Sequence, residues 1–165
     1  MKKTIYAVVF MALLLSSCAN EFNKVYKSTD NNFKYEYAKE SFVKGKYVRA
    51  SSLLQGLVTM QKGSENAQES LYMLGLSEFN SRDYEGAAAT FKKYCQSYPK
   101  GYYTQEARFL IGMSLYNCTP EPRLDQSQTV NAIAAFQEYI DLYPDGNQKK
   151  DAQQRLFELQ DKLVQ

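Results

Sequence analysis

Apolar residues recur every three or four positions along most of the chain, which is the period of amphipathic α-helices. No segment shows a convincing alternation of apolar and polar residues, so the pattern predicts an all-α fold. Asp83 is the expected N-cap of the fourth predicted helix, and Ser127 or Thr129 that of the sixth, because short polar side chains accept from first-turn N–H groups. The predicted helices are Asn32–Lys44, Tyr47–Met60, Ala67–Asn80, Tyr84–Tyr98, Thr104–Asn117, Val130–Tyr143 and Gln148–Val164.

Small, aromatic and proline residues recur at a fixed spacing within these helices. Gly75, Ala87, Phe91 and Pro99 lie at offsets of 0, 12, 16 and 24. Small residues allow two helices to cross closely, an aromatic ring fills the space between them, and proline ends the second helix. These offsets resemble the tetratricopeptide repeat, a helix–turn–helix unit of about 34 residues. The resemblance implies a fold that binds segments of other proteins along a groove.

The same spacing appears on both sides of this unit. The matching positions are Ala38, Ala50 and Leu54 upstream, and Gly112, Ala132, Phe136 and Pro144 downstream. The third unit has eight extra residues, which fall in the proline-containing segment Thr119–Thr129 and predict an enlarged turn. We therefore expect a tetratricopeptide solenoid of three repeats, followed by a terminal capping helix that covers the last pair.

The N-terminus predicts a secreted, lipid-modified protein. Lys2 and Lys3 precede the apolar run Ile5–Leu15, which is too short to span a membrane and typical of a signal peptide. The run ends in Leu15-Ser16-Ser17-Cys18, which resembles the bacterial lipobox. That resemblance implies cleavage before Cys18 and attachment of N-acyl (palmitate-type) and S-diacylglycerol lipid to it. The alternative is an ordinary signal peptide with an incidental cysteine.

The residue after Cys18 is Ala19 and not Asp, which by analogy with such lipoproteins favours the outer membrane. Several acyl chains on one residue give stable membrane anchoring. We expect residues 1–17 to be the signal peptide, residues 18–31 a lipidated flexible tether, and residues 32–165 the repeat domain.

Charge and composition argue against several functions. Of 20 basic side chains, removal of Lys2 and Lys3 leaves 18, against 18 acidic ones, so nothing favours nucleic acid as a partner. The chain has no histidine, which removes His-based triads, most zinc sites and the commonest general base. It has no phosphate-binding glycine loop. We predict that the protein is not an enzyme and has no metal or cofactor besides its lipid.

Two cysteines remain in the repeat domain. Cys95 lies near the end of one predicted helix and Cys118 at the end of the next, antiparallel one. At 1.5 Å per residue the two lie about 20 Å apart, beyond disulfide reach. We expect two buried free thiols.

Aromatic residues occupy two fixed positions in the first helix of every repeat. Taking Ala38, Gly75 and Gly112 as reference positions, a ring stands three residues before and four residues after each. Rings seven apart share one stripe of a helix, and that helix lines the concave face of such repeats. The stripe predicts a groove for apolar or aromatic peptide segments. The alternative, that the rings form core between helices, is open. The six residues are Tyr35, Phe42, Tyr72, Phe79, Phe109 and Tyr116.

Finally, a set of residues resembles the BamD (ComL) family of outer-membrane assembly lipoproteins. The most distinctive element is the lengthened turn that ends in Asp125-Gln126 and Thr129. Gly146 departs from the family, which usually has Ser there, and the family is longer, with further C-terminal repeats. The other matching residues are Tyr98-Pro99, Glu106-Ala107, Ala132-Ile133, Phe136-Gln137, Tyr143-Pro144, Asp151-Ala152 and Leu163.

The resemblance implies a scaffold of the β-barrel assembly machinery, anchored at the periplasmic face of the outer membrane. Its expected partners are unfolded outer-membrane proteins, a BamA-like barrel subunit and other machinery components. The absent repeats resemble those that dock BamA, so that contact is left open. The alternative function is a general tetratricopeptide lipoprotein adaptor that recruits other periplasmic proteins.

Overall fold

The computed structural model describes residues 21–60 and 66–164, and within these ranges the regular structure is entirely helical. The all-α prediction is confirmed. Three of the seven predicted helices have the predicted bounds, and the others differ at their ends. The helices are α2 (Asn31–Val43), α3 (Tyr47–Met60), α4 (Ala67–Asn80), α5 (Tyr84–Ser97), α6 (Thr104–Asn117), α7 (Ser127–Leu142) and α8 (Lys149–Leu163).

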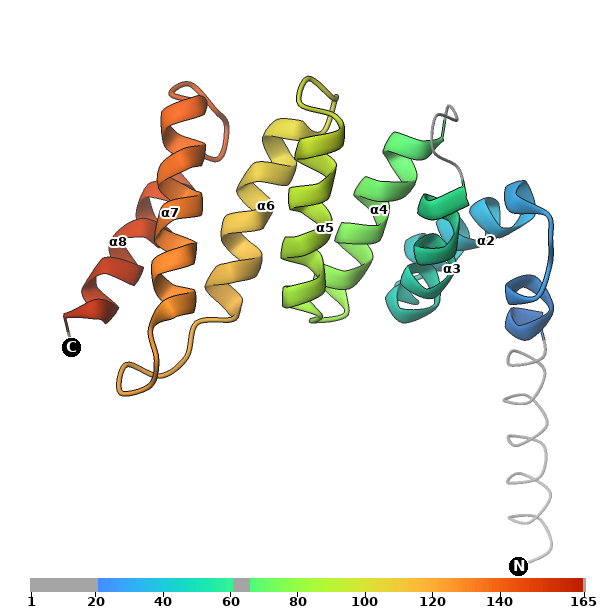
Figure 1. Ribbon diagram of the computed structural model, residues 1–165, viewed down its shortest axis with the longest axis horizontal. Coiled ribbons are helices and arrows are strands. Elements are labelled where there is room, and N and C mark those ends of the chain that lie inside the picture. The colour runs from blue at the N-terminus through green and yellow to red at the C-terminus, as the bar shows by residue number, and fades with distance from the viewer. Residues whose placement is uncertain (1–20, 61–65, 165) are drawn as a thin grey trace, which may run out of the picture.

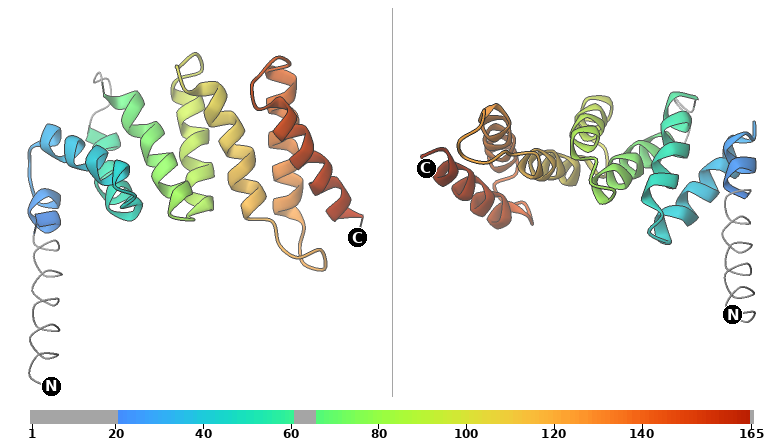
Figure 2. Two further views of the ribbon diagram at one scale, coloured as in Figure 1. Left: turned by 180° about the vertical axis from the view of Figure 1, so that it is seen from behind. Right: turned by 90° about the horizontal axis from the view of Figure 1, so that it is seen from below.

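Consecutive helices pack as antiparallel neighbours and form an elongated two-layer array. One layer contains α3, α5 and α7, and the other contains α2, α4, α6 and α8 (Figure 2). We call the second group the A helices and the first group the B helices. Each A helix pairs with the following B helix, and α8 stands as the A helix after the third pair. This arrangement confirms the predicted solenoid.

Close helix crossings within repeats two and three explain the spacing in the sequence. A Cβ added to Gly75 would lie 2.6 Å from the Phe91 ring, and one added to Gly112 would lie 2.7 Å from the Phe136 ring. Both rings are fully buried. Glycine at these positions therefore lets each aromatic ring pack directly on the A-helix backbone.

At the same positions the first repeat has alanine in place of glycine and leucine in place of phenylalanine. Ala38, Ala50 and Leu54 are all fully buried there. They belong to a core cluster that also contains Met73 and Leu74 of α4, whereas repeats two and three and α8 share a second cluster. The array thus has two apolar cores that meet along α4.

The part of the expected tether that the structure describes differs from that prediction. Residues 21–26 are helical, Val25 is 1% exposed, and Phe22 packs against the core of the first repeat. Arg49 of α3 also lies over the Phe22 ring, 5.5 Å from its centre. The two apolar side chains Phe22 and Val25 thus dock this otherwise polar segment on the first repeat.

The caps of α5 and α7 test the two expected N-caps. The Asp83 carboxylate accepts a hydrogen bond from the Gly86 N–H at 3.0 Å, which confirms that cap. The prediction for α7 was wrong, because Ser127 already lies in the helix. The Asp125 carboxylate instead accepts from the N–H and hydroxyl of Ser127, at 3.1 and 2.8 Å, and Thr129 is buried and donates to Gln126 at 2.7 Å.

A tyrosine links each of the last two B helices to the A helix that follows. We call such a contact between one repeat and the next a joint. The Tyr94 hydroxyl accepts from Gln68 at 2.6 Å and from the N–H of Tyr103 at 3.2 Å. The Tyr139 hydroxyl accepts from Gln105 at 3.3 Å and donates to Gln148 at 2.9 Å.

Glycine in the following turn makes room for these hydroxyl groups. A Cβ on Gly101 would lie 2.8 Å from the Tyr94 hydroxyl oxygen, and one on Gly146 would lie 2.7 Å from that of Tyr139. This close approach gives a physical reason for Gly146, where the resembling family usually has Ser.

Both cysteines are free, which confirms the prediction that they do not pair. Cys95 is buried as expected, but Cys118 is only half-buried. Cys118 follows the last residue of α6, at the start of the enlarged turn.

Candidate functional site

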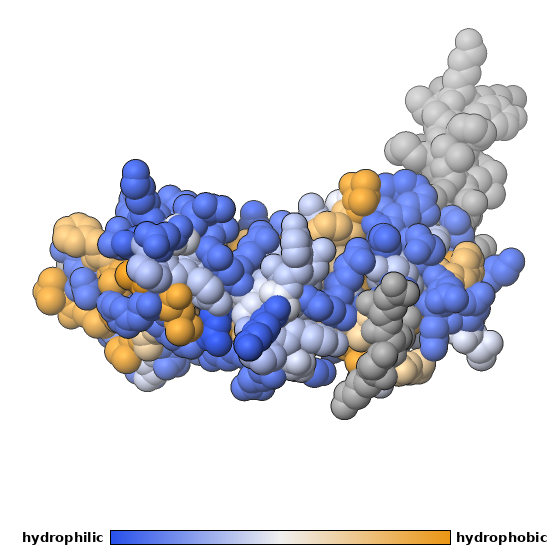
Figure 3. Space-filling model, turned by 90° about the horizontal axis from the view of Figure 1, so that it is seen from above, coloured by the Kyte–Doolittle hydropathy of each residue, from blue (hydrophilic) through white to orange (hydrophobic). Residues whose placement is uncertain are grey.

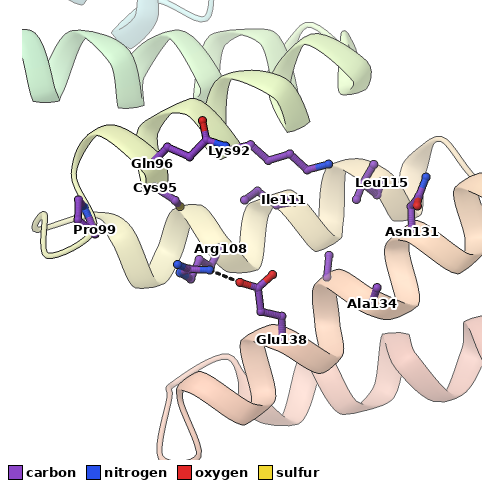
Figure 4. Close-up of a pocket in the computed structure, with 11 residues that line it drawn as sticks. Lys92, Cys95, Gln96, Pro99, Arg108, Ile111, Leu115, Asn131, Ala134 and Glu138 are labelled. Carbon is purple, nitrogen blue, oxygen red and sulfur yellow. Dashed lines mark hydrogen bonds and ion pairs between the residues drawn. The ribbon is translucent and has the colours of Figure 1, made fainter.

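The array carries two hollows of interest, one on each layer. The larger, about 510 Å³, lies between α5, α6 and α7 (Figure 4). Cys95, Ile111 and Ala135 are among its lining residues, and Arg108 of α6 pairs with Glu138 of α7 beside them. Burial raises the pKa of the Cys95 thiol, so the sulfur stays protonated and is a poor nucleophile. We assign no chemistry to this hollow.

The second hollow, about 230 Å³, opens on the A-helix layer between α2 and α4 and extends to the start of α6. We call it the A-layer pocket. Its lining is largely apolar and aromatic, with one cation and one carboxylate. The residues are Lys39, Phe42, Val43, Glu69, Tyr72, Met73, Leu76 and Tyr103.

Two stacked tyrosines form one wall of the A-layer pocket. The rings of Tyr72 and Tyr103 are parallel, with centres 4.2 Å apart. Tyr72 also contacts the rings of Phe91 and Tyr94, with centres 5.9 and 5.7 Å away. Burial, and then its hydrogen bond to Glu106, raise the pKa of Tyr72, so this hydroxyl remains a neutral donor. The wall is therefore rigid and uncharged.

The opposite rim carries a charged pair and an exposed apolar side chain. Lys39 Nζ lies 3.9 Å from a Glu69 carboxylate oxygen and 5.1 Å from the centre of the Tyr35 ring. The Tyr35 hydroxyl is close enough to Glu69 for that carboxylate to help raise its pKa, after burial, but it makes no hydrogen bond of good geometry. Val43, at the end of α2, is 83% exposed. An apolar pocket beside an exposed valine can take up an apolar side chain from another molecule.

The six predicted stripe residues are divided between core and surface. Tyr35 and Tyr72 are 3% and 6% exposed, and the other four are half-buried. Phe42 and Tyr72 line the A-layer pocket. Phe42 and Phe79 each pack edge-on against the first residue of the next helix, Tyr47 and Tyr84. The remaining pair, Phe109 and Tyr116, contacts α7 and α8, respectively.

Sequence reasoning missed four apolar residues that complete the pocket, Val43, Met73, Leu76 and Tyr103. Val43 follows the stripe residue Phe42 by one position, and Leu76 follows the stripe residue Tyr72 by four, which is about one helical turn. A wider stripe, which included the positions next to each ring on the helix surface, would have contained both. Tyr103 stands in a turn, outside the helical periodicity on which the stripe was based, and carried no such signal.

The remaining predictions concern lipid attachment, membrane spans and metal sites. Cys18 lies outside the described residues, so its lipid attachment stays a prediction. None of the described helices has the length and apolar character needed to cross a membrane. In the same ranges, no group of three or more Cys, Asp or Glu side chains is placed to hold a metal ion.

Comparison with known proteins identifies the family. A model of the YfiO family, described as outer membrane lipoprotein, matches residues 27–165. The chain belongs to the YfiO outer membrane lipoprotein family. This match confirms the resemblance noted in the sequence and agrees with the expected association with the outer membrane.

A curated relative is the outer membrane protein assembly factor BamD of Caulobacter vibrioides. It is 22% identical over 161 residues, which cover 96% of this chain and 53% of the relative. The chain therefore spans about half the length of the curated relative that it matches.

Proposed function

We propose that this YfiO-family chain is a scaffold of the β-barrel assembly machinery, held by its lipid at the periplasmic face of the outer membrane. Its partners are unfolded outer-membrane proteins and subunits of the machinery, among them a BamA-like barrel subunit. The family match and the printed role of the relative as an assembly factor support this proposal.

Lipid on Cys18 supplies the anchor in this proposal. The lipobox-like sequence before Cys18 supports it. Fractionation of cells that produce Cys18→Ala tests it directly. We expect the variant to fold, as judged by an unchanged helical circular dichroism spectrum, and to leave the membrane fraction. A variant that stays in the membrane as firmly as the original protein contradicts lipid anchoring.

The A-layer pocket is the proposed binding site for an extended, unfolded segment. The observation that carries this assignment is its lining, in which Phe42, Tyr72 and Met73 form apolar walls beside the exposed Val43. Contiguous apolar surface that faces solvent is a mark of an interaction site. Outer-membrane proteins that end in an aromatic residue offer a ring for such a pocket.

The test is the affinity for a synthetic peptide that ends in Phe, measured by isothermal titration calorimetry. Val43→Gln places a polar group at the pocket, and Val48→Gln is its matched control, because Val48 is also exposed but lies in the first turn of α3, outside the pocket. We expect binding that Val43→Gln weakens and Val48→Gln leaves unchanged. Equal binding by both variants contradicts the pocket assignment and favours the general adaptor function.

A further inference from the structure

The repeats allow the A-layer pocket to be compared with its own neighbours. Tyr35 and Tyr72 occupy equivalent positions, 37 residues apart, as do the reference residues Ala38 and Gly75. Glu69 and Glu106 are also 37 residues apart. Each of the first two joints therefore brings a tyrosine of one A helix close to a glutamate of the next.

At the first joint this pair holds a cation. Lys39 Nζ lies 5.1 Å from the centre of the Tyr35 ring and 3.9 Å from Glu69. The face of an aromatic ring and a carboxylate both attract a cation, so together they form a suitable binding place for one.

A tyrosine and a glutamate hold a second cation where α6 meets α8. Arg155 Cζ lies 5.1 Å from the centre of the Tyr116 ring, and Arg155 donates to Glu158 at 2.8 Å. The Tyr116 hydroxyl donates to the same carboxylate, also at 2.8 Å. The combination of tyrosine, glutamate and cation thus occurs twice in the part of the chain that the structure describes.

The second joint has the tyrosine and the glutamate without the cation. Tyr72 hydrogen-bonds to Glu106, and the position equivalent to Lys39 is Leu76. No ion pair joins Glu106 to a lysine or arginine within residues 21–60 and 66–164. The exposed carboxylate of Glu106 therefore stands beside Tyr72, which forms the aromatic wall of the pocket together with Tyr103. The two charged residues that line the pocket, Lys39 and Glu69, pair with each other.

On this basis, and resting on the peptide site proposed above, we propose that the pocket recognises an unfolded segment in which an Arg or Lys lies close to an apolar residue. The apolar side chain enters between Phe42 and Met73, and the cation binds Glu106 at the edge of the Tyr103 ring. The incoming cation supplies the charge that Lys39 supplies at the first joint.

The test uses the Phe-ending peptide in a series. A single Arg is moved through the positions that precede the Phe, and each Arg peptide is compared with the same peptide carrying Gln or Glu there. We expect the best Arg peptide to bind about 3- to 10-fold more tightly than its Gln counterpart, with Glu weaker than Gln. High salt should reduce this difference.

Two variants locate the effect. Glu106→Gln removes the charge at an exposed position and keeps an acceptor for Tyr72, so we expect it to fold and to bind Arg and Gln peptides equally. Glu85→Gln is the matched control, because Glu85 is also exposed in the first turn of its helix but lies outside the A-layer pocket, and we expect the Arg preference to remain. Leu76→Lys copies the first joint and should abolish the preference by supplying an internal cation.

The outcomes separate the two proposals. Equal binding of Arg, Gln and Glu peptides, or an Arg preference that Glu106→Gln leaves unchanged, overturns the charge preference alone. If no peptide of the series binds, the peptide site itself is wrong and the preference fails with it.

Discussion

The first joint of the array differs from the two that follow. At the second and third joints, Tyr94 and Tyr139 are fully buried, and their hydroxyl groups hydrogen-bond to the N-cap residue of the next A helix, Tyr103 and Gln148, respectively. The equivalent residue at the first joint is Leu57, which is 1% exposed and has no polar group to orient. Apolar contact is non-directional, whereas hydrogen bonds fix geometry.

This difference predicts that the joints differ in how firmly they fix neighbouring helices. We expect the later joints to hold α4 to α8 more firmly in one arrangement than the first joint holds α2 and α3 against α4. The A-layer pocket lies where these two parts meet, with Phe42 and Val43 on one side and Tyr72 and Tyr103 on the other. A pocket of this kind can adapt to side chains of different size.

The largest expected effects come from emptying the two cores. Phe91→Ala should lower the free energy of unfolding by about 3–5 kcal/mol, and Leu54→Ala by about 2–5 kcal/mol, because each leaves a cavity. Urea unfolding gives these values, and amide hydrogen exchange shows where each variant opens. We expect Leu54→Ala to expose mainly α2 and α3, and Phe91→Ala to expose the later helices. Identical exchange patterns would show that the joints do not differ.

Smaller losses should follow from filling the space beside the tyrosine hydroxyls. Gly101→Ala and Gly146→Ala place a methyl group below 3 Å from those oxygens and should each cost about 1–3 kcal/mol. Gly56→Ala in α3 is the control, because its Cβ meets no atom within 4 Å. It should stabilise the protein by about 0.5–1 kcal/mol, since alanine favours a helix over glycine. Thermal unfolding should therefore show shifts of opposite sign.

Removing the hydroxyls alone should cost somewhat less. Tyr94→Phe and Tyr139→Phe leave half-buried partners unpaired, and we expect each to lower stability by about 1–2 kcal/mol. Tyr102→Phe should change nothing, because Tyr102 is 88% exposed. If Tyr94→Phe melts at the same temperature as the original protein, the hydrogen bonds do not stiffen the joint.

The sequence predicted most of this framework. Helix bounds and repeat register followed from glycine, alanine, phenylalanine and proline, whose sizes and backbone properties act locally. The Tyr94 and Tyr139 joints were missed, although each tyrosine follows Phe91 or Phe136 by three residues and precedes a glycine by seven. That regularity was available, but the role of the hydroxyl depends on partners up to 34 residues away.

The candidate site was harder to predict than the fold. Helical periodicity puts Tyr35 and Phe42 on one stripe, but it does not tell how deeply a neighbouring A helix covers each ring. Tyr35 proved almost fully buried, and Phe42 reached the pocket. The N-cap prediction for α7 failed for a related reason, because several consecutive polar residues could each cap this helix. The carboxylate that accepts from a first-turn N–H is that of Asp125, which lies before the helix.

The smallest expected effect concerns one buried carboxyl at the end of α4. Burial raises the pKa of Glu78 above its ordinary value near 4.5, against a lowering by its hydrogen bond with Thr90, and Asp83 adds to the rise. The folded protein therefore holds this proton more tightly than the unfolded chain, and stability falls as the pH rises above the ordinary value.

Glu78→Gln removes this dependence. We expect the variant to melt at a higher temperature than the original protein at pH 8, and the gap to shrink as the pH falls to 4. The equivalent residue in the third repeat is Leu115, so Leu115→Met serves as a control with a pH-independent difference. A gap that widens on acidification contradicts this reasoning.

The stacked pair of Tyr72 and Tyr103 also gives the protein an optical signal of its own. The chain has 14 tyrosines and no tryptophan, so ultraviolet absorption and emission come from phenol rings with no indole to mask them. Two parallel rings 4.2 Å apart couple their electronic transitions. A segment that enters beside Tyr103 should change this coupling, so near-ultraviolet circular dichroism can follow occupation of the pocket without any attached label.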